Sequence, residues 1–159
     1  MGVSFRYAER SDKGKLQNFT CAPPKPSYGQ NDPAPYQREV QGHIRGLKIP
    51  TPPDEKVLLC EEDSDIIAVF HFGFDNTGEL IILFALGVDV DKRRSGLARG
   101  MMERVLKECS DIKDSSQLNK LELIGRVAPD NLIMHVFLPK FGFIKDGKDN
   151  GYDLYRKFI

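Results

Sequence analysis

The chain has 159 residues and a mass of 18.0 kDa, the size of one domain with a core of its own. Its 23 basic and 23 acidic side chains cancel, which disfavours a nucleic-acid or membrane binder that relies on a basic surface. The first residues lack a secretory pattern, and the longest apolar run, Leu80 to Val88, is about half the length of a membrane helix. We therefore expect a cytoplasmic protein with no membrane partner.

The first third of the chain is rich in proline. Eight of the ten prolines lie in the stretch 23–53, which predicts loops on either side of a short helix. Between Tyr36 and Leu47, apolar residues recur at helical spacing, so this helix should dock on the body of the protein.

Strand signals dominate the next third. Val57 to Glu61 and Ile66 to Phe74 read as a hairpin, and the turn Asp75 to Gly78 leads to a third strand, Leu80 to Val90. The run from Leu80 is apolar without alternation, which predicts a central strand covered on both faces.

The character of the sequence changes after Val90. A polar loop, Asp91 to Gly96, precedes apolar residues at helical spacing from Leu97 to Cys109, and a polar linker, Ser110 to Asn119, follows. Lys120 to Val127 alternates as a strand. The order strand, helix, strand predicts a parallel pair of strands.

The C-terminal part contains one short helix and two strands. The helix is expected from Asn131 to Phe137 and should end by Pro139. The strands, Phe141 to Lys145 and Tyr152 to Phe158, should flank a turn from Asp146 to Gly151. If the edge of the last strand is uncovered, a second copy can pair with it to give a homodimer.

The three cysteines are odd in number and widely spaced, which predicts neither a disulfide framework nor a metal site. Cys109 belongs to the apolar stripe of a predicted helix, so we interpret it as a small core residue rather than a nucleophile.

The most informative segment runs from Arg93 to Ala98, between an apolar strand and the start of a helix. Backbone N–H groups converge there with the positive end of the helix dipole, which makes a cradle for an anion. The glycine spacing matches neither the Walker loop nor the dinucleotide fingerprint.

The order Arg-x-x-Gly-x-Ala after a central strand resembles the pyrophosphate loop of the GNAT superfamily of acyl-coenzyme A-dependent N-acyltransferases. The preceding segment, Leu86 to Arg93, is similar to that family's strand-to-loop segment, although Val90 stands where proline is usual. Asn131, followed by Gly142 and Phe143, resembles the second family signature. The resemblance covers Glu55 to Ile159.

This resemblance implies an α+β fold in α/β/α layers, whose mixed, mostly antiparallel sheet has about six to seven strands and a parallel splayed pair. The whole chain, 1–159, would form one such domain, with the proline-rich segment 21–53 on the acceptor side. Tyr28, Tyr36 and His43 would line an acceptor pocket, and the charged turn with Asp146 and Asp149 could attract a cationic amine.

The resemblance also assigns roles by position. Acetyl-CoA would be the co-substrate, and its pantetheine arm would pair with the backbone of Leu86, Gly87 and Val88 and face Asn131. The Val88 N–H would be the oxyanion donor. The pyrophosphate would be held by the loop residues Arg93, Arg94, Ser95, Gly96, Leu97 and Ala98.

The proton donor for the departing thiolate is where the sequence differs from the family. The position usually taken by tyrosine is Leu138. His135 lies on the same helical face as Leu138 and is a candidate replacement for the tyrosine. Glu79 is a candidate base, and the alternative is that Glu79 is only a solvated residue of the turn. For His71, which lies among aromatic residues, core packing is the favoured interpretation.

Three functions stay open at this point. The first is an N-acetyltransferase acting on a primary amine of a small molecule or peptide. The second is a toxin-type acetyltransferase of aminoacylated transfer RNA, for which the basic cluster Lys92 to Arg99 is the relevant feature. The third is a sensor or docking module that binds acyl-CoA and has lost the catalytic acid at Leu138.

Overall fold

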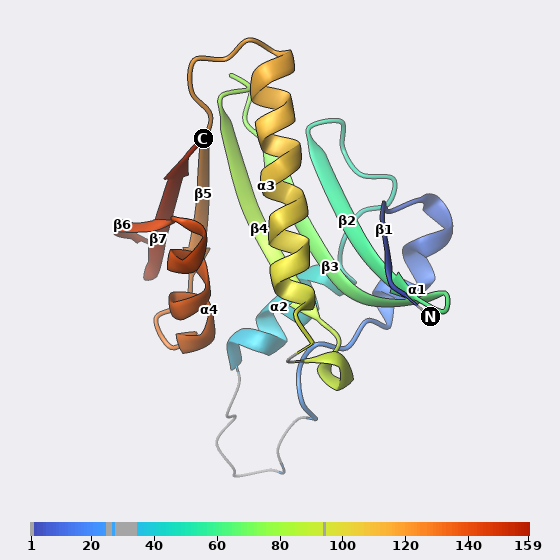
Figure 1. Ribbon diagram of the computed structural model, residues 1–159. Helices are drawn as coiled ribbons and strands as arrows, with labels where there is room; N and C mark the ends of the chain where they lie inside the picture. The colour runs from blue at the N-terminus through green and yellow to red at the C-terminus, as the bar shows by residue number, and fades with distance from the viewer. Residues whose placement is uncertain (1, 25–26, 28–34, 94) are drawn as a thin grey trace. The chain divides into compact units, whose positions relative to one another are not determined.

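A computed structural model describes residues 2–24, 27, 35–93 and 95–159 (Figure 1). The ordered elements within these residues follow one another along the chain as strands, α-helices and short 3-10 helices. They are β1 (Ser4–Tyr7), η1 (Arg10–Asp12), α1 (Lys13–Gln17), α2 (Pro35–Arg45), β2 (Glu55–Glu62), β3 (Asp65–Phe74), β4 (Leu80–Val88), η2 (Val90–Lys92), α3 (Leu97–Ser115), β5 (Glu122–Val127), α4 (Leu132–Phe137), η3 (Leu138–Phe141), β6 (Ile144–Asp149) and β7 (Tyr152–Phe158).

The strands form one seven-stranded mixed sheet in the order β1-β2-β3-β4-β5-β7-β6. Strand β4 pairs with β5 in parallel, from Leu80 opposite Glu122 to Leu83 opposite Gly125. A parallel pair needs a crossover connection, and α3 supplies it. The predicted α+β fold with a parallel pair in a mixed sheet is confirmed.

The chain forms two compact units. The first contains residues 1–71 and 85–102, and the second contains residues 72–84 and 103–159. The first unit has a buried core in which α1, α2 and the segment between them meet strands β2 and β3. Its members are Leu16, Phe19, Cys21, Ile44, Ile49, Val57, Leu59, Ile66, Val69 and Ala85.

Helix α2 packs closely on strand β4 in this core. A Cβ atom added to Gly87 would lie 2.6 Å from Ile44 Cδ1, 3.2 Å from Phe19 Cε2 and 3.3 Å from Cys21 Sγ. Real Cβ atoms do not approach other atoms as closely as 2.6 Å, so a side chain at residue 87 would push Ile44 away. The core is therefore tightly packed over the backbone of Gly87.

Replacing Gly87 with alanine should destabilise the protein by about 1–3 kcal/mol, because the added methyl group overpacks the core. Urea unfolding measures this change. Gly42→Ala is the matched control, since it lies on α2 and a Cβ there meets nothing within 4 Å. Equal stability of Gly87→Ala and the unsubstituted chain would contradict the close packing of Ile44 on β4.

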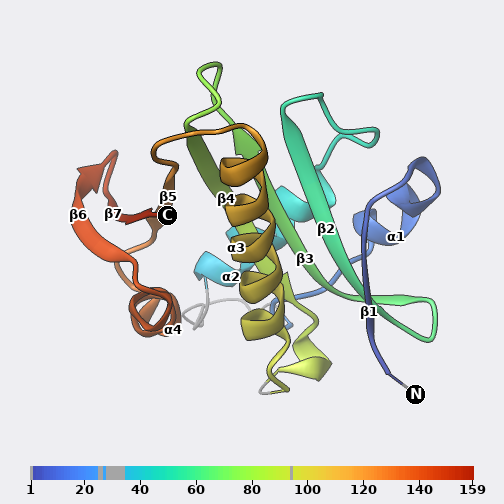
Figure 2. The same cartoon turned by 45° about the horizontal axis from the view of Figure 1, so that its top comes forward.

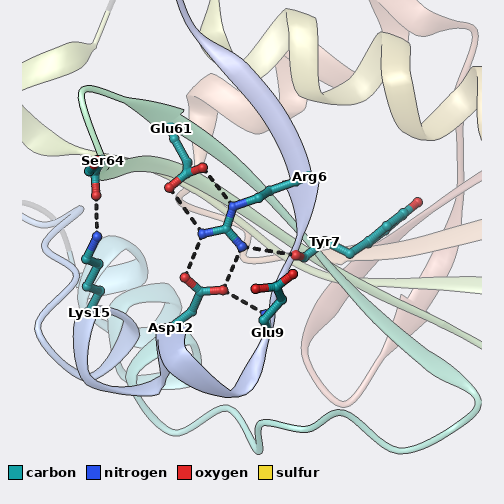
Figure 3. A network of polar contacts seen from close by, with 7 residues as sticks. All are labelled: Arg6, Tyr7, Glu9, Asp12, Lys15, Glu61 and Ser64. Carbon is teal, nitrogen blue, oxygen red and sulfur yellow. Dashed lines mark hydrogen bonds and ion pairs between the residues drawn. The ribbon is translucent and has the colours of Figure 1, made fainter.

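Figure 3 shows a second constraint on the first unit, an ionic network around Arg6 of strand β1. The Arg6 guanidinium donates to both carboxylate oxygens of Asp12, at 2.8 and 2.7 Å, and to both of Glu61, at 2.7 and 3.1 Å. Asp12 also accepts from the backbone N–H of Glu9 at 2.7 Å. The network joins the N-terminal strand to η1 and to β2.

Asp12→Ala should cost about 2 kcal/mol, because it removes two charge-assisted hydrogen bonds from a buried carboxylate. The hydrogen bonds from Arg6 hold the pKa of Asp12 below its ordinary value. Its contribution is therefore present at neutral pH and is lost as the pH falls below about 4. Denaturant unfolding at several pH values should show the difference between the two proteins shrinking below that pH. A constant difference would contradict the charged pairing.

In the second unit, β5, β7 and β6 lie side by side, as Figures 1 and 2 show in orange and red. Strand β6 continues to Asp149, so the sequence interpretation of 146–151 as a turn was wrong in extent. The turn is only Asn150 and Gly151, both with positive φ of 50° and 84°. These residue types tolerate that conformation, and pairing of Asp149 with Tyr152 extends the strand to the turn.

The edge predicted for a second copy is not available on β7, because β7 pairs with β5 on one side and with β6 on the other. Strand β6 occupies the end of the sheet instead. All its residues are exposed, its ladder shifts register between Lys145 and Lys148, and Gly147 has a φ of 85°. This strand is therefore irregular along its outer edge.

Other differences from the sequence interpretation are local. Phe84 is 41% exposed, so β4 is not covered on both faces along its whole length. Helix α3 runs to Ser115, further than the predicted linker allowed, and η3 continues the chain past Pro139 because proline is accepted in its first turn. Strand β1 and helix α1 were not predicted. Among the described residues, no helix is long and apolar enough to cross a membrane.

Candidate active site

The loop after β4 lies in the first unit and is held by backbone hydrogen bonds. The Asp89 N–H donates to the Ile67 carbonyl at 2.9 Å, and the Val90 N–H donates to the Thr20 carbonyl at 3.0 Å. The Asp89 side chain accepts from the Asp91 N–H at 2.8 Å and so caps η2. The strand therefore ends at a fixed point, directly before the predicted anion loop.

Gly96 has a φ of 80° and immediately precedes α3, a helix of 19 residues. The Gly100 N–H donates to the Gly96 carbonyl at 3.0 Å, which starts the helical ladder. The first turn of such a helix carries N–H groups with no partner inside the helix and a partial positive charge. A Cβ at Gly96 meets nothing within 4 Å, so the backbone is approachable there. This geometry suits an anion.

Side chains of the same loop are engaged with the protein. The Arg93 guanidinium donates to the Cys21 carbonyl, and Ser95 Oγ donates to the Lys92 carbonyl. Lys92 Nζ lies 2.8 Å from a Glu62 carboxylate oxygen. The predicted anion cradle would therefore rely mainly on backbone groups. Arg94, the remaining loop residue of the prediction, lies outside the described residues.

The predicted pantetheine residues Leu86, Gly87 and Val88 form the last part of β4. The parallel register between β4 and β5 ends at Leu83, five residues before the strand itself does. An extended ligand binds a strand through the strand's backbone N–H and C=O groups, which is the role predicted for these three residues.

Asn131, in the second unit, is the N-cap of α4. Its side-chain oxygen accepts from the Met134 N–H at 3.2 Å. The amide oxygen is therefore in use as a helix cap.

His135 ties α4 to its neighbours through both ring nitrogens. Nδ1 lies 2.6 Å from the Tyr155 hydroxyl, and Nε2 lies 3.2 Å from the Ala128 carbonyl. Nε2 is also 3.4 Å from a carboxylate oxygen of the buried Asp153. Because a carbonyl can only accept, Nε2 carries the proton and Nδ1 accepts from Tyr155. Leu138 is buried and offers no proton.

His135→Ala should lower stability by about 1–3 kcal/mol, because the buried Tyr155 hydroxyl loses its acceptor. Acetyl transfer should fall by less than about tenfold. Thermal denaturation and turnover of the same samples measure both, with Val136→Ala, an exposed residue on the same helix, as control. A loss of several hundredfold in turnover at unchanged stability would instead make His135 the proton donor.

The carboxylates predicted to attract an amine are paired with arginines. Asp146 lies 2.8 Å from Arg156 Nε, and Asp149 lies 3.5 Å from Arg126 Nη1. Glu79 is exposed beside the turn that starts at Asp75.

All three cysteines are buried, and burial raises the pKa of Cys21 to about 11, which suits a core residue.

Sequence reasoning missed a chain of polar contacts in the first unit. Glu55 Oε1 lies 2.6 Å from His71 Nε2, and His71 Nδ1 lies 2.8 Å from His43 Nε2. His71 is buried, as predicted, yet both of its ring nitrogens are hydrogen-bonded. The sequence signal at position 71 was a histidine in a mostly apolar strand.

Comparison with known proteins places this geometry in a family. Residues 18–143 match the acetyltransferase (GNAT) family. The chain belongs to the GNAT acetyltransferases. No curated protein sequence matches it.

Three solved structures show the breadth of the fold similarity. PaiA N-acetyltransferase from Thermoplasma acidophilum, solved in complex with coenzyme A, has a TM-score of 0.69 at 16% identity, covering 99% of each chain. The ribosomal-protein alanine N-acetyltransferase from Escherichia coli has a TM-score of 0.64 at 14% identity, covering 99% of this chain and 93% of that one. A chimera of the spermidine N-acetyltransferase SpeG from Vibrio cholerae and hSSAT has a TM-score of 0.62 at 18% identity, covering 100% and 95%.

Proposed function

We propose that this GNAT acetyltransferase transfers the acetyl group of acetyl-CoA to a primary amine by direct attack of the amine on the thioester. The observation that carries the proposal is the N-terminus of α3, a helix of 19 residues. Gly96, whose φ lies in the left-handed region of backbone conformations, directly precedes this helix. The site lies within the matched family segment, and the family uses acetyl-CoA.

The first unit supplies the groups that this reaction needs toward the cofactor. The N–H groups around Ser95 to Ala98 would hold the pyrophosphate, and the backbone of Leu86 to Val88 would pair with the pantetheine arm. The Val88 N–H would stabilise the oxyanion that forms when the amine attacks.

The acceptor class rests on chemistry and on two relatives. Direct attack requires a nitrogen with a lone pair, and amines supply it once deprotonated. By their names, one relative acetylates spermidine and another acetylates an alanine of a ribosomal protein. Both acceptors are amines, one a small molecule and the other part of a polypeptide.

Calorimetric titration with acetyl-CoA tests the cofactor site. The unsubstituted chain should bind in the micromolar range, and Gly96→Glu should weaken binding by at least about tenfold, because a carboxylate enters the positive end of the helix dipole.

Gly78→Glu is the matched control, because Gly78 also has positive φ, 74°, and also has open space where a Cβ would lie. Gly78→Glu introduces the same backbone strain and the same charge as Gly96→Glu, but in the turn between β3 and β4. The control should bind acetyl-CoA like the unsubstituted chain. Equal loss in both variants would assign the effect to stability, and no heat from the unsubstituted chain would overturn the cofactor site.

A further inference from the structure

Helix α4 of the second unit is made almost entirely of apolar residues, yet none of its six residues is buried against the described part of the chain. A helix that is apolar on all sides is normally enclosed by protein. Leu132, Ile133 and Val136 are instead 71%, 62% and 59% exposed. Three of the eight exposed large apolar side chains among the described residues therefore lie on this one short helix, whereas such side chains are usually scattered singly.

These three side chains share the outer face of α4. Their positions, i, i+1 and i+4, span about 100° of the helix surface. The opposite face holds the helix in its unit, because the His135 ring lies 2.6 Å from the Tyr155 hydroxyl and Leu138 is buried. The apolar face thus points outward because of the way the helix is docked.

A charged residue lies at each end of this face. Asp130 comes just before α4, and Lys140 lies in η3, one turn after Val136. The backbone keeps helical angles through Phe137 and Leu138, so α4 and η3 form one helical segment, and the two charges are about 15 Å apart along it. Both side chains are exposed, and neither has a hydrogen bond or ion pair to a residue that the structure describes.

The segment is complementary to a second copy of itself. A two-fold axis through the centre of the apolar face packs the two segments in opposite directions. Asp130 of one copy then lies opposite the partner's Lys140, and the symmetry forms the same pair a second time. The helix dipoles also oppose each other, which favours this direction. A parallel arrangement would bring like charges together, so the charge pattern fits a second copy in the antiparallel direction.

We infer that the outer face of α4 is the surface through which two copies of this chain associate, as a symmetric antiparallel pair of helices. This surface differs from the edge of β7 that the sequence suggested, since β7 is paired on both sides. The inference concerns assembly and does not depend on the acetyl transfer.

The contact is small, so the dimer is weak. Three side chains a copy are far fewer than the roughly 20–30 residues that each partner contributes to a standard interface. Phe137, one turn after Ile133, adds half-buried apolar surface together with Phe141, whose ring centroid is 4.9 Å from its own. We expect a dissociation constant on the order of 100 μM, at which monomer and dimer exchange readily.

Sedimentation equilibrium of the full chain from about 10 μM to about 1 mM tests the association. The mean mass should rise with concentration from 18.0 kDa toward twice that value. Ile133→Glu should raise the dissociation constant at least about tenfold, because a carboxylate enters an apolar contact. A glutamate in the first turn of α4 suits the helix dipole, so this variant should stay folded, which thermal denaturation checks.

Val3→Glu is the matched control. Val3 is also an exposed apolar residue, at 42%, but it lies in the first unit. The substitution adds the same charge and removes exposed apolar surface away from α4. This variant should associate like the unsubstituted chain. Equal weakening in both variants would assign the effect to net charge and overturn the α4 surface.

Charge exchange tests the partner and its direction. Asp130→Lys and Lys140→Asp should each weaken the dimer about tenfold at low salt, because each places like charges opposite each other in both symmetric pairs. The double variant, which carries both substitutions, should restore the dimer, since the pairs are re-formed with exchanged signs. A general disturbance of α4 by either substitution would not be reversed by adding the second. Failure of the double variant to recover would overturn the antiparallel pairing.

Amide NMR shifts locate the contact without any substitution. Between dilute and concentrated samples, the changes should be confined to α4, η3 and the residues beside them. Changes confined to another part of the chain would overturn the inference. A chain that stays monomeric up to about 1 mM would do the same and would leave the apolar face to a different partner.

Discussion

Helix α2 packs against strand β4 at Gly87, a position where the strand has no side chain. The 2.6 Å that would separate a Cβ of Gly87 from Ile44 Cδ1 leaves no room for even a methyl group. Ile44 is fully buried at this contact, and the next residue back along the helix is His43. A side chain at residue 87 would therefore displace Ile44, the residue that follows His43 on the helix.

Strand β4 contributes to the proposed cofactor site through its backbone. At Gly87 it packs against α2, and after Val88 it ends in the loop that leads to Gly96. Each of these features is a matter of backbone position rather than of a reactive side chain on the strand. A site of this kind tolerates wide sequence variation, in keeping with relatives that share the fold at 14–18% identity.

Sequence periodicity predicted the elements whose signals are local. The helix expected between Tyr36 and Leu47, the turns before and after β3, and the loop before Leu97 all appear, with the helix ending at Arg45. An apolar run alone does not tell which faces are covered, which is why the exposure of Phe84 was missed. The polar composition of 146–149 suggested a turn, but pairing with β7 makes these residues a strand.

Contacts between distant residues were beyond the reach of the sequence. His43 and His71 are 28 positions apart, His71 and Glu55 are 16 apart, and Arg6 and Glu61 are 55 apart. No periodic pattern relates such positions, because their proximity is produced by strand order and helix packing. The loop before Leu97 could be predicted because its residues are consecutive, whereas the hydrogen bonds that join His43, His71 and Glu55 could not.

The two outer strands of the sheet, β1 and β6, offer shorter or less regular edges than the strands between them, and this matters while the chain is still folding. Strand β1 has only four residues, and β6 is broken by a register shift at Lys145 and Lys148 and by Gly147. A short strand and an irregular, charged one are poor templates for intermolecular ladders. Chains that meet at high concentration therefore have little regular strand edge on which to pair with one another. The apolar strands, which could aggregate, lie between β1 and β6 in the sheet.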